Sequence, residues 1–455
     1  MLKSIKIKKL FNIFDYNIEL DNKKLIIITG PNGYGKSTIL KILEAINKLD
    51  LSYFYGISFE EITFNFKSDE EKVELKKVDD ELIINGQNIK DILKNLLNKE
   101  FDHMNIHSRR ILEKRILRNK ISHGFEKDYE REYEKEFFKK LLNKYIKIDY
   151  SDVNDIIEDY INNNEDYANN EDCANNGIKI FYNNREEVYF IKEQRLIKKI
   201  SNDNEYNDRE YKRNNLGYIV GKINKTTEVI DNIPEKIREI ISEVSQRYSK
   251  EANIIDSSYP VRLFANDTGL TEEEYKSKII DIRKKFDKLN AYDISEVKFE
   301  KDITFKEEHS KALKIYFDDF DKKYQVYEDM LEKFDLFMDI INTKLAFKNI
   351  KISKETGLSI VDMQGREFKL SMLSSGEKQM IVLFYNLIFE INNESLLLMD
   401  EPEISLHISW QQEFMSDLLR VLDKKNINII VATHSPQILS NYWDNQIDLG
   451  EIYGK

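Results

Sequence analysis

The chain has 455 residues, of which 41% are hydrophobic and 33% are charged, with a formal net charge of -12 and a pI near 5.3. This length and hydrophobic content predict a globular protein of about two or three compact units. The acidic balance disfavours a protein that coats nucleic acid over its whole surface, although it allows a local basic patch.

The apolar runs and the single cysteine predict a cytoplasmic protein without a membrane segment. No run reaches the roughly 18 uncharged apolar residues of a membrane helix. The N-terminus has lysines threaded through it and lacks the apolar core of a signal peptide. Cys173 lies in an Asn-rich stretch without a partner for a disulfide or a zinc site, and we interpret it as a bystander thiol.

Residues 1–85 predict short strands around one helix that begins at Lys36. The runs alternate with period two or are continuously apolar, as expected of a small mixed sheet beside a buried parallel strand. The predicted strands are 5–10, 16–20, 25–29, 57–66 and 73–84.

The middle of the chain predicts two helical insertions, 86–177 and 201–347, separated by a short segment, 178–200. The first insertion ends in a polar loop, 162–176, and the segment between the insertions carries strands at 178–182 and 188–191. In the second insertion, 313–345 predicts one long helix or two in line. Its heptads are too few for a long coiled coil, so we expect it to pack against the core or a partner. From 348 to 455 strands and helices alternate, which predicts a parallel sheet.

The stretch GPNGYGKST, Gly30 to Thr38, lies between an apolar strand and an apolar helix. In this geometry backbone N–H groups and a helix N-terminus converge on phosphate. We expect Lys36 to reach the β- and γ-phosphates of a nucleotide and the Ser37 hydroxyl to ligate Mg²⁺. The predicted nucleotide-binding residues of this loop are Asn32, Gly33, Gly35, Lys36, Ser37 and Thr38.

Three later motifs predict the partners of this loop. In LLLMDEPE, an apolar strand ends in Asp400, placed to hold Mg²⁺ through water, and Glu401, placed to polarise the attacking water; a solvated strand end is the alternative. LSSGEKQ, 373–379, opens an apolar helix and predicts a second anion site, although it also fits a simple helix cap. His434 follows a buried strand, 427–433, where a γ-phosphate lies in a parallel sheet.

Together these motifs resemble the ABC-type ATPases that are not transporters, a group that includes Rad50, SMC proteins and the OLD-like AAA ATPases of bacterial defence. The resemblance covers 1–50 and 351–446. It implies an α/β fold, a P-loop NTPase of ABC ATPase type whose two-lobed head has a mixed sheet and a large helical insertion. The N-terminal lobe would be 1–85, joined by 178–200, and the C-terminal lobe 348–455.

The same resemblance assigns roles to single residues. It implies a Walker A motif at 30–38, a Walker B motif at 396–401, a D-loop at 405–407 and His434 as the switch histidine. The signature would contact nucleotide through Ser374, Ser375, Gly376 and Glu377. The segment 188–197 resembles the strand before a Q-loop, so Gln194 would sense Mg²⁺ and the attacking water; a surface turn is the alternative.

Two departures narrow the family. His407 replaces the aspartate of many ABC proteins, and the insertions are too short for the arms of Rad50 or SMC. The runs DEPEISLHISWQQEF and ATHSPQIL, with Trp443, look most like the ATPase subunits of two-gene antiphage systems of the Septu or PARIS kind. That resemblance implies a separate effector nuclease of HNH or TOPRIM type, because little chain follows the last predicted strand.

The implied function is an ATPase that uses ATP and Mg²⁺ and forms a homodimer or a higher homo-oligomer through its ATP sites. Glu401, His434, Lys36 and Gln194 would be catalytic, and a phage protein is a possible trigger. A DNA repair-type ATPase that acts on DNA ends is the alternative. The densest basic stretch, 107–120, carries Arg110, Lys114 and Arg118 on one helical face, and it fits either a phosphate-binding or partner-binding surface or a solvated helix.

Overall fold

The structure, a computed structural model, contains two compact units. The first unit comprises Met1–Lys192, Asn393–Pro402 and Asn426–Lys455, and the second comprises Glu193–Asn392 and Glu403–Lys425. The residues described are 2–21, 23–48, 50–67, 71–79, 81–89, 180–181, 183–184, 186–192, 197–199, 211–213, 219–222, 226–265, 268–297, 305–393, 395–404, 406–425, 427–439 and 441–453.

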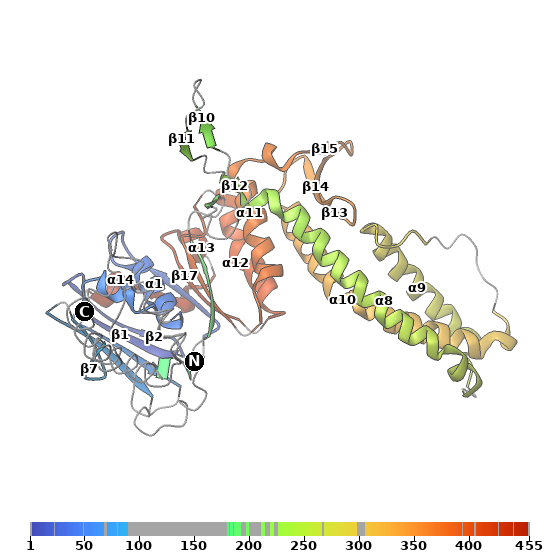
Figure 1. The fold of residues 1–455 in the computed structure, drawn as a ribbon, viewed down its shortest axis with the longest axis horizontal. Coiled ribbons are helices and arrows are strands. Elements are labelled where there is room, and N and C mark those ends of the chain that lie inside the picture. The colour runs from blue at the N-terminus through green and yellow to red at the C-terminus, as the bar shows by residue number, and fades with distance from the viewer. Residues whose placement is uncertain are drawn as a thin grey trace, which may run out of the picture. The chain divides into compact units, whose positions relative to one another are not determined.

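An antiparallel sheet forms one layer of the first unit (Figure 1). Its strand order is β2-β1-β4-β5-β6-β7, so the predicted small mixed sheet is wrong. The predicted strand 73–84 is two strands joined by a turn at Asp79, whose φ is 49°, and the predicted strand 57–66 begins only at Glu61. The strands are β1 (Leu2–Leu10), β2 (Phe14–Glu19), β4 (Glu61–Phe66), β5 (Lys72–Val78), β6 (Glu81–Ile84) and β7 (Gln87–Asn88).

A parallel sheet gathers strands from distant parts of the chain. Its order is β18-β3-β17-β16-β8, and every neighbouring pair is parallel. Continuous apolar runs form these strands because both faces of the central strands are buried. The strands are β3 (Leu25–Thr29), β8 (Glu187–Ile191), β16 (Ser395–Asp400), β17 (Asn428–Ala432) and β18 (Gln446–Asp448).

Helix α1 (Lys36–Asn47) belongs to the same hydrophobic core as both sheets. It buries Ile39, Leu40, Ile42 and Leu43 in one cluster with side chains of both sheets. The predicted strand 178–182 is wrong, because residues 180 and 181 are helical and Phe181 packs edge-on against the ring of Phe64. Short helices among the described residues of this unit include α2 (Ser52–Tyr55), α13 (Pro436–Leu439), η7 (Trp443–Asn445) and α14 (Leu449–Tyr453).

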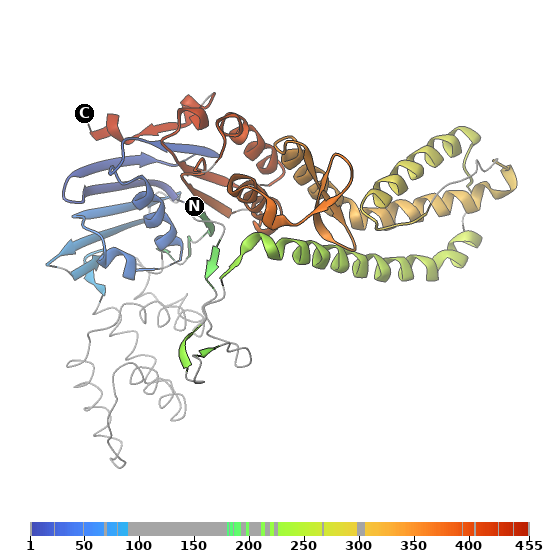
Figure 2. The ribbon, with the colours of Figure 1, turned by 90° about the horizontal axis from the view of Figure 1, so that it is seen from above.

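Two 33-residue helices, α8 (Ile233–Ala265) and α10 (Ser310–Asn342), form a hairpin in the second unit (Figure 2). They are antiparallel, because Tyr248 contacts Tyr327 while Arg262, further along α8, pairs with Asp319, earlier in α10. The long helix predicted over 313–345 is therefore confirmed, and it packs against another helix of the same unit. α9 (Glu272–Ala291) lies against α10 through rings such as those of Phe286 and Phe320.

The base of the hairpin joins a small antiparallel sheet and two further helices. A parallel sheet was predicted from residue 348 onward. The region begins instead with an antiparallel meander, β13-β14-β15. These elements are β13 (Lys348–Ser353), β14 (Gly357–Asp362), β15 (Glu367–Phe368), η5 (Leu370–Met372), α11 (Ser375–Tyr385), the π-helix η6 (Asn386–Glu390) and α12 (Ile408–Leu422).

Short strands and 3-10 helices complete the second unit. β9 (Ile197–Lys199) pairs with β12 (Thr226–Glu228), and β10 (Tyr211–Arg213) pairs with β11 (Ile219–Lys222). The 3-10 helices are η3 (Val229–Asn232) and η4 (Glu307–His309). Among the described residues, none of the helices combines the length and the apolar character needed to cross a bilayer.

Candidate functional site

The loop between β3 and α1 has the backbone of a phosphate cradle. Gly30, Gly33 and Gly35 have φ values of 140°, 86° and 86°, which L-residues rarely adopt. A Cβ at Gly35 would lie 3.0 Å from Leu10 and 3.3 Å from the Phe11 ring, whereas one at Gly33 would meet no heavy atom within 4 Å. The loop is therefore packed at its base and open at Gly33, where a ligand has room to approach the backbone.

Lys36 is folded back onto this loop. Its side chain is 6% exposed, and its ammonium donates to the carbonyl oxygens of Gly30 at 2.9 Å and Pro31 at 3.4 Å. The Glu401 carboxylate lies 4.0 Å from the same ammonium. A buried ammonium whose acceptors are neutral carbonyls is placed to exchange those contacts for charged phosphate oxygens.

Ser37 and Asp400 are 363 positions apart in sequence, and the parallel sheet brings them together. The Ser37 hydroxyl donates to Asp400 Oδ1 at 2.9 Å. Asp400 is the last residue of β16, and Ser37 lies in the first turn of the helix that follows β3; both strands flank β17, and the parallel order puts their carboxyl ends at the same edge of the sheet. A hydroxyl and a carboxylate are the hard oxygen ligands that Mg²⁺ prefers, so the donor set fits the predicted metal.

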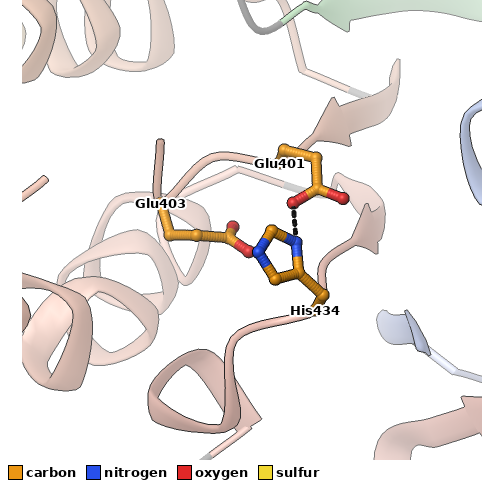
Figure 3. A group of neighbouring side chains, drawn as sticks. All are labelled: Glu401, Glu403 and His434. Atoms are coloured by element: carbon orange, nitrogen blue, oxygen red, sulfur yellow. Dashed lines mark ion pairs between the residues drawn. The ribbon is translucent and has the colours of Figure 1, made fainter. Parts of the chain in front are cut away.

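Glu401 and His434 meet beside this pair, each just after the end of a paired strand (Figure 3). His434 Nδ1 forms an ion pair with Glu401 Oε2. The Glu401 side chain is 15% exposed and that of His434 is 55% exposed, so the imidazole reaches solvent while the carboxylate points inward. Glu401 has a φ of 47°, and its N–H donates to the carbonyl of Ala432 at 2.8 Å. Figure 3 also labels Glu403, which follows Glu401 by two residues.

The signature residues open α11 in the second unit. Ser374 is the N-cap, and its N–H donates to Glu377 Oε2 at 2.9 Å while its hydroxyl accepts the Glu377 N–H at 3.4 Å. Ser374 and Ser375 are exposed, whereas Gly376 and Glu377 are buried. The alternative of a helix cap is thus correct for Ser374 and Glu377, and it leaves an exposed helix N-terminus that can accept an anion.

Three further predicted residues lie near the phosphate loop or at the start of α12. Asn32 is exposed on the loop, and Thr38 lies in the first turn of α1, where its hydroxyl hydrogen-bonds Tyr53. His407 caps α12, with Nδ1 accepting the Ser409 N–H. Gln194, Cys173, Ser405 of the predicted D-loop and the basic stretch 107–120 lie outside the described residues.

Phe11 is a candidate residue that the sequence reasoning missed. It is 38% exposed, lies next to Gly35, and has a φ of 54° beside Asn12 at 62°. Left-handed backbone at two successive non-glycine residues costs energy and is concentrated at functional sites. The only signal in the sequence was an aromatic residue between two predicted strands.

Comparison with known proteins identifies the family. The family model described as "AAA domain, putative AbiEii toxin, Type IV TA system" matches residues 25–440. The chain belongs to this family of ABC-like AAA ATPases. The predicted resemblance to non-transporter ABC-type ATPases and the predicted fold class, an α/β P-loop fold with a large helical insertion, are therefore confirmed.

Individual relatives of this AAA-family chain match shorter segments. It is 29% identical over 144 residues to the "Retron Ec83 probable ATPase" of Escherichia coli, covering 29% of this chain and 26% of that protein. It is 30% identical over 124 residues to the "Septu protein PtuA" of Bacillus thuringiensis, covering 24% of this chain and 30% of that protein. The chain thus spans about a quarter of the length of the retron ATPase. An SMC head domain of Pyrococcus furiosus aligns over 97% of this chain and 91% of its own, at 13% identity and a TM-score of 0.34.

Proposed function

We propose that this protein hydrolyses ATP at the site formed by the phosphate loop and the ends of β16 and β17. The hydrogen bond between Ser37 and Asp400 is the observation that carries the proposal, because it joins the two motifs that such a site requires. Lys36, Glu401 and His434 lie in the same cluster. A bare glycine turn or a solvated strand end, the two alternatives, would not require this convergence.

Each side chain has a chemical task in this proposal. Lys36 exchanges its bonds to the loop carbonyls for bonds to the β- and γ-phosphates. Glu401 accepts a proton from the attacking water, and His434 holds the carboxylate in place through its ion pair. Ser37 and Asp400 would hold Mg²⁺, which neutralises charge on the phosphates when bound.

The exposed signature motif supports a shared ATP site between two copies. Ser374 and Ser375 present a capped helix N-terminus at the surface of the second unit, as a site completed by another subunit requires. In the proposed head-to-tail homodimer, ATP held by the phosphate loop of one copy contacts this N-terminus of its partner. ATP then stabilises the closed dimer, and hydrolysis releases it.

The proposed role is antiphage defence in the cytoplasm. Relatives that carry the names of a retron ATPase and a Septu protein support it, together with the family match to a toxin-antitoxin ATPase domain. In this role the ATP state holds or releases a separate effector nuclease of HNH or TOPRIM type in response to a phage trigger. The α8–α10 hairpin contacts the signature helix within the second unit, so its movement could transmit the ATP state to the effector.

Two variants test the shared site. Ser375→Arg should leave ATP binding by the isolated chain intact, because Lys36 and Ser37 are unchanged, yet abolish ATP-dependent dimerisation and reduce phosphate release together. Ser257→Arg, at an exposed position on α8, is the matched control, and it should change neither ATP-dependent dimerisation nor phosphate release. A Ser375→Arg protein that still dimerises with ATP and turns over normally would exclude the shared site.

Copurification tests the effector. The protein with Glu401→Gln, expected to be trapped with ATP, should retain a nuclease encoded beside its gene more strongly than a Lys36→Ala protein that does not bind ATP. Retention of DNA instead of a nuclease would favour the alternative, a repair-type ATPase that acts on DNA ends.

A further inference from the structure

Glu377 is held by two donors at the start of the signature helix. Its Oε2 atom accepts from the Ser374 N–H at 2.9 Å and from the Lys348 ammonium at 3.0 Å. Glu377 is 9% exposed, and the Lys348 side chain is 27% exposed. Burial raises the pKa of Glu377, but the Ser374 N–H and the Lys348 ammonium outweigh it and the net shift is downward, so the carboxylate remains charged.

A charged carboxylate creates a conflict at this place. The N-terminus of α11 attracts anions through its N–H groups and its dipole. Glu377 lies only two residues after the exposed Ser375 and would repel a triphosphate that approached it. The glutamate is nevertheless needed by the fold, because it completes the capping box of α11.

We infer that Lys348 is a positioning residue that neutralises Glu377, so that the capped N-terminus of α11 attracts the triphosphate held by the partner subunit. The inference rests on the proposed ATP-bridged dimer and adds a residue to it. The partly buried ion pair removes the repulsion, while the exposed Ser374 and Ser375 form the surface that would meet the ligand.

The local fold also places a second acid opposite Lys348, and that acid already has other partners. Lys348 is the first residue of β13 and lies opposite Asp362 of β14. The carboxylate of Asp362 is taken by Arg366 at 2.7 Å and by the N–H of Gln364 at 2.8 Å. With that acid already engaged, the Lys348 ammonium extends to Glu377.

The turn before β13 fixes the lysine further. Phe347 has a φ of 61°, and the Asn342 side chain at the end of α10 accepts the N–H of Ile350 at 2.7 Å. The end of the helical hairpin is thereby attached to the strand that carries Lys348. A shift of the hairpin would move the ammonium relative to the carboxylate and change the charge at the signature.

A double-variant cycle tests the electrostatic role. In protein carrying Glu401→Gln, the ATP-dependent monomer–dimer equilibrium is measured by analytical ultracentrifugation. Lys348→Met should weaken dimerisation about tenfold or more, as expected when one partner of a partly buried ion pair is lost at an interface. Lys348→Arg, which keeps the positive charge, should dimerise nearly as strongly as the parent. Lys351→Met, which removes an exposed lysine of the same strand, is the matched control and should have no effect.

The second arm separates charge from packing. Glu377→Gln keeps an oxygen that can accept the Ser374 N–H but removes the charge, so Lys348→Met combined with Glu377→Gln should dimerise nearly as well as the parent. ATP binding to the monomer confirms that each variant is folded. A double variant as weak as Lys348→Met alone, or a Lys348→Met protein equal to the parent, would overturn the inference while leaving the dimer intact. A parent that fails to dimerise with ATP would overturn the proposed dimer and this inference with it.

Discussion

Replacing Glu401 with glycine or alanine should abolish ATP hydrolysis equally, yet leave two proteins of different stability. Glu401 has a φ of 47°, in the left-handed region. In this region an L-residue such as alanine is strained by about 1–2 kcal/mol, whereas glycine is not. Glycine in turn loses more backbone entropy on folding than alanine does, which costs about 0.5–1 kcal/mol. Because both variants lack the carboxylate, the contacts with Lys36 and His434 are lost equally. The glycine variant should therefore be about 0.5–1 kcal/mol more stable than the alanine variant.

Thermal and chemical unfolding measure that difference. For a unit of this size, 1 kcal/mol corresponds to about 2–4 °C in Tm, so the glycine variant should melt roughly 1–4 °C higher. Phosphate release should fall at least about a hundredfold in both, the usual contribution of a general base. An alanine variant as stable as the glycine variant would refute the strain at this position, and normal turnover in either would refute the role of Glu401 as the base.

Three further outcomes follow from other parts of the chain. Phe11→Ala should raise KM for ATP about tenfold with little change in kcat, as measured by steady-state phosphate release, because we expect the exposed ring beside Gly35 to stack on the base of ATP. Lys344→Met should lower the free energy of unfolding by about 1–3 kcal/mol in denaturant titrations, because it removes the 2.9 Å partner of buried Asp417 and leaves that carboxylate, among the described residues, only Arg420 at 3.5 Å; adding Asp417→Leu should recover most of that loss. Burial lowers the pKa of Lys425 to about 8 from 10.5, so the unfolded chain binds the extra proton between these values and stability rises with pH. Relative to Lys425→Met, wild type should gain in the free energy of unfolding between about pH 7.5 and pH 10, by less than the full pKa difference implies because solvent screens the partly exposed ammonium.

The sequence predicted the elements around the site best where one physical signal dominated. The predicted strand 25–29 and the strand predicted from Leu396 are continuous apolar runs, and the structure has strands at 25–29 and 395–400. The helix predicted to begin at Lys36 begins there. Prediction failed where one sequence pattern is compatible with two different secondary structures. Residues 73–84 keep their alternation through a turn, and the short apolar run at 178–182 contains helical residues although it fitted a strand.

Contacts between elements were predictable only where a motif encoded them. The pairing of Ser37 with Asp400 followed from the phosphate loop and the acidic strand, because their chemistry requires a shared metal site. The pairing of Lys348 with Glu377 had no such signal. It depends on the register of β13 with β14 and on which acid Arg366 already occupies, and neither can be read from spacing along the chain.

The groups expected to bind ATP already have partners within the chain. Lys36 donates to loop carbonyls and Ser37 donates to Asp400. ATP binding by one copy therefore exchanges hydrogen bonds, and each exchange yields only about 0.5–1.5 kcal/mol. In the proposed dimer, the exposed N-terminus at Ser375 of a second copy supplies further binding energy. By linkage, the apparent Kd for ATP of the Glu401→Gln protein should fall as protein concentration rises through the dimer transition. Ser375→Arg should remove this dependence while keeping the weak monomer affinity. An ATP affinity that is tight and independent of concentration in the parent would place the binding energy within a single copy and contradict the shared site.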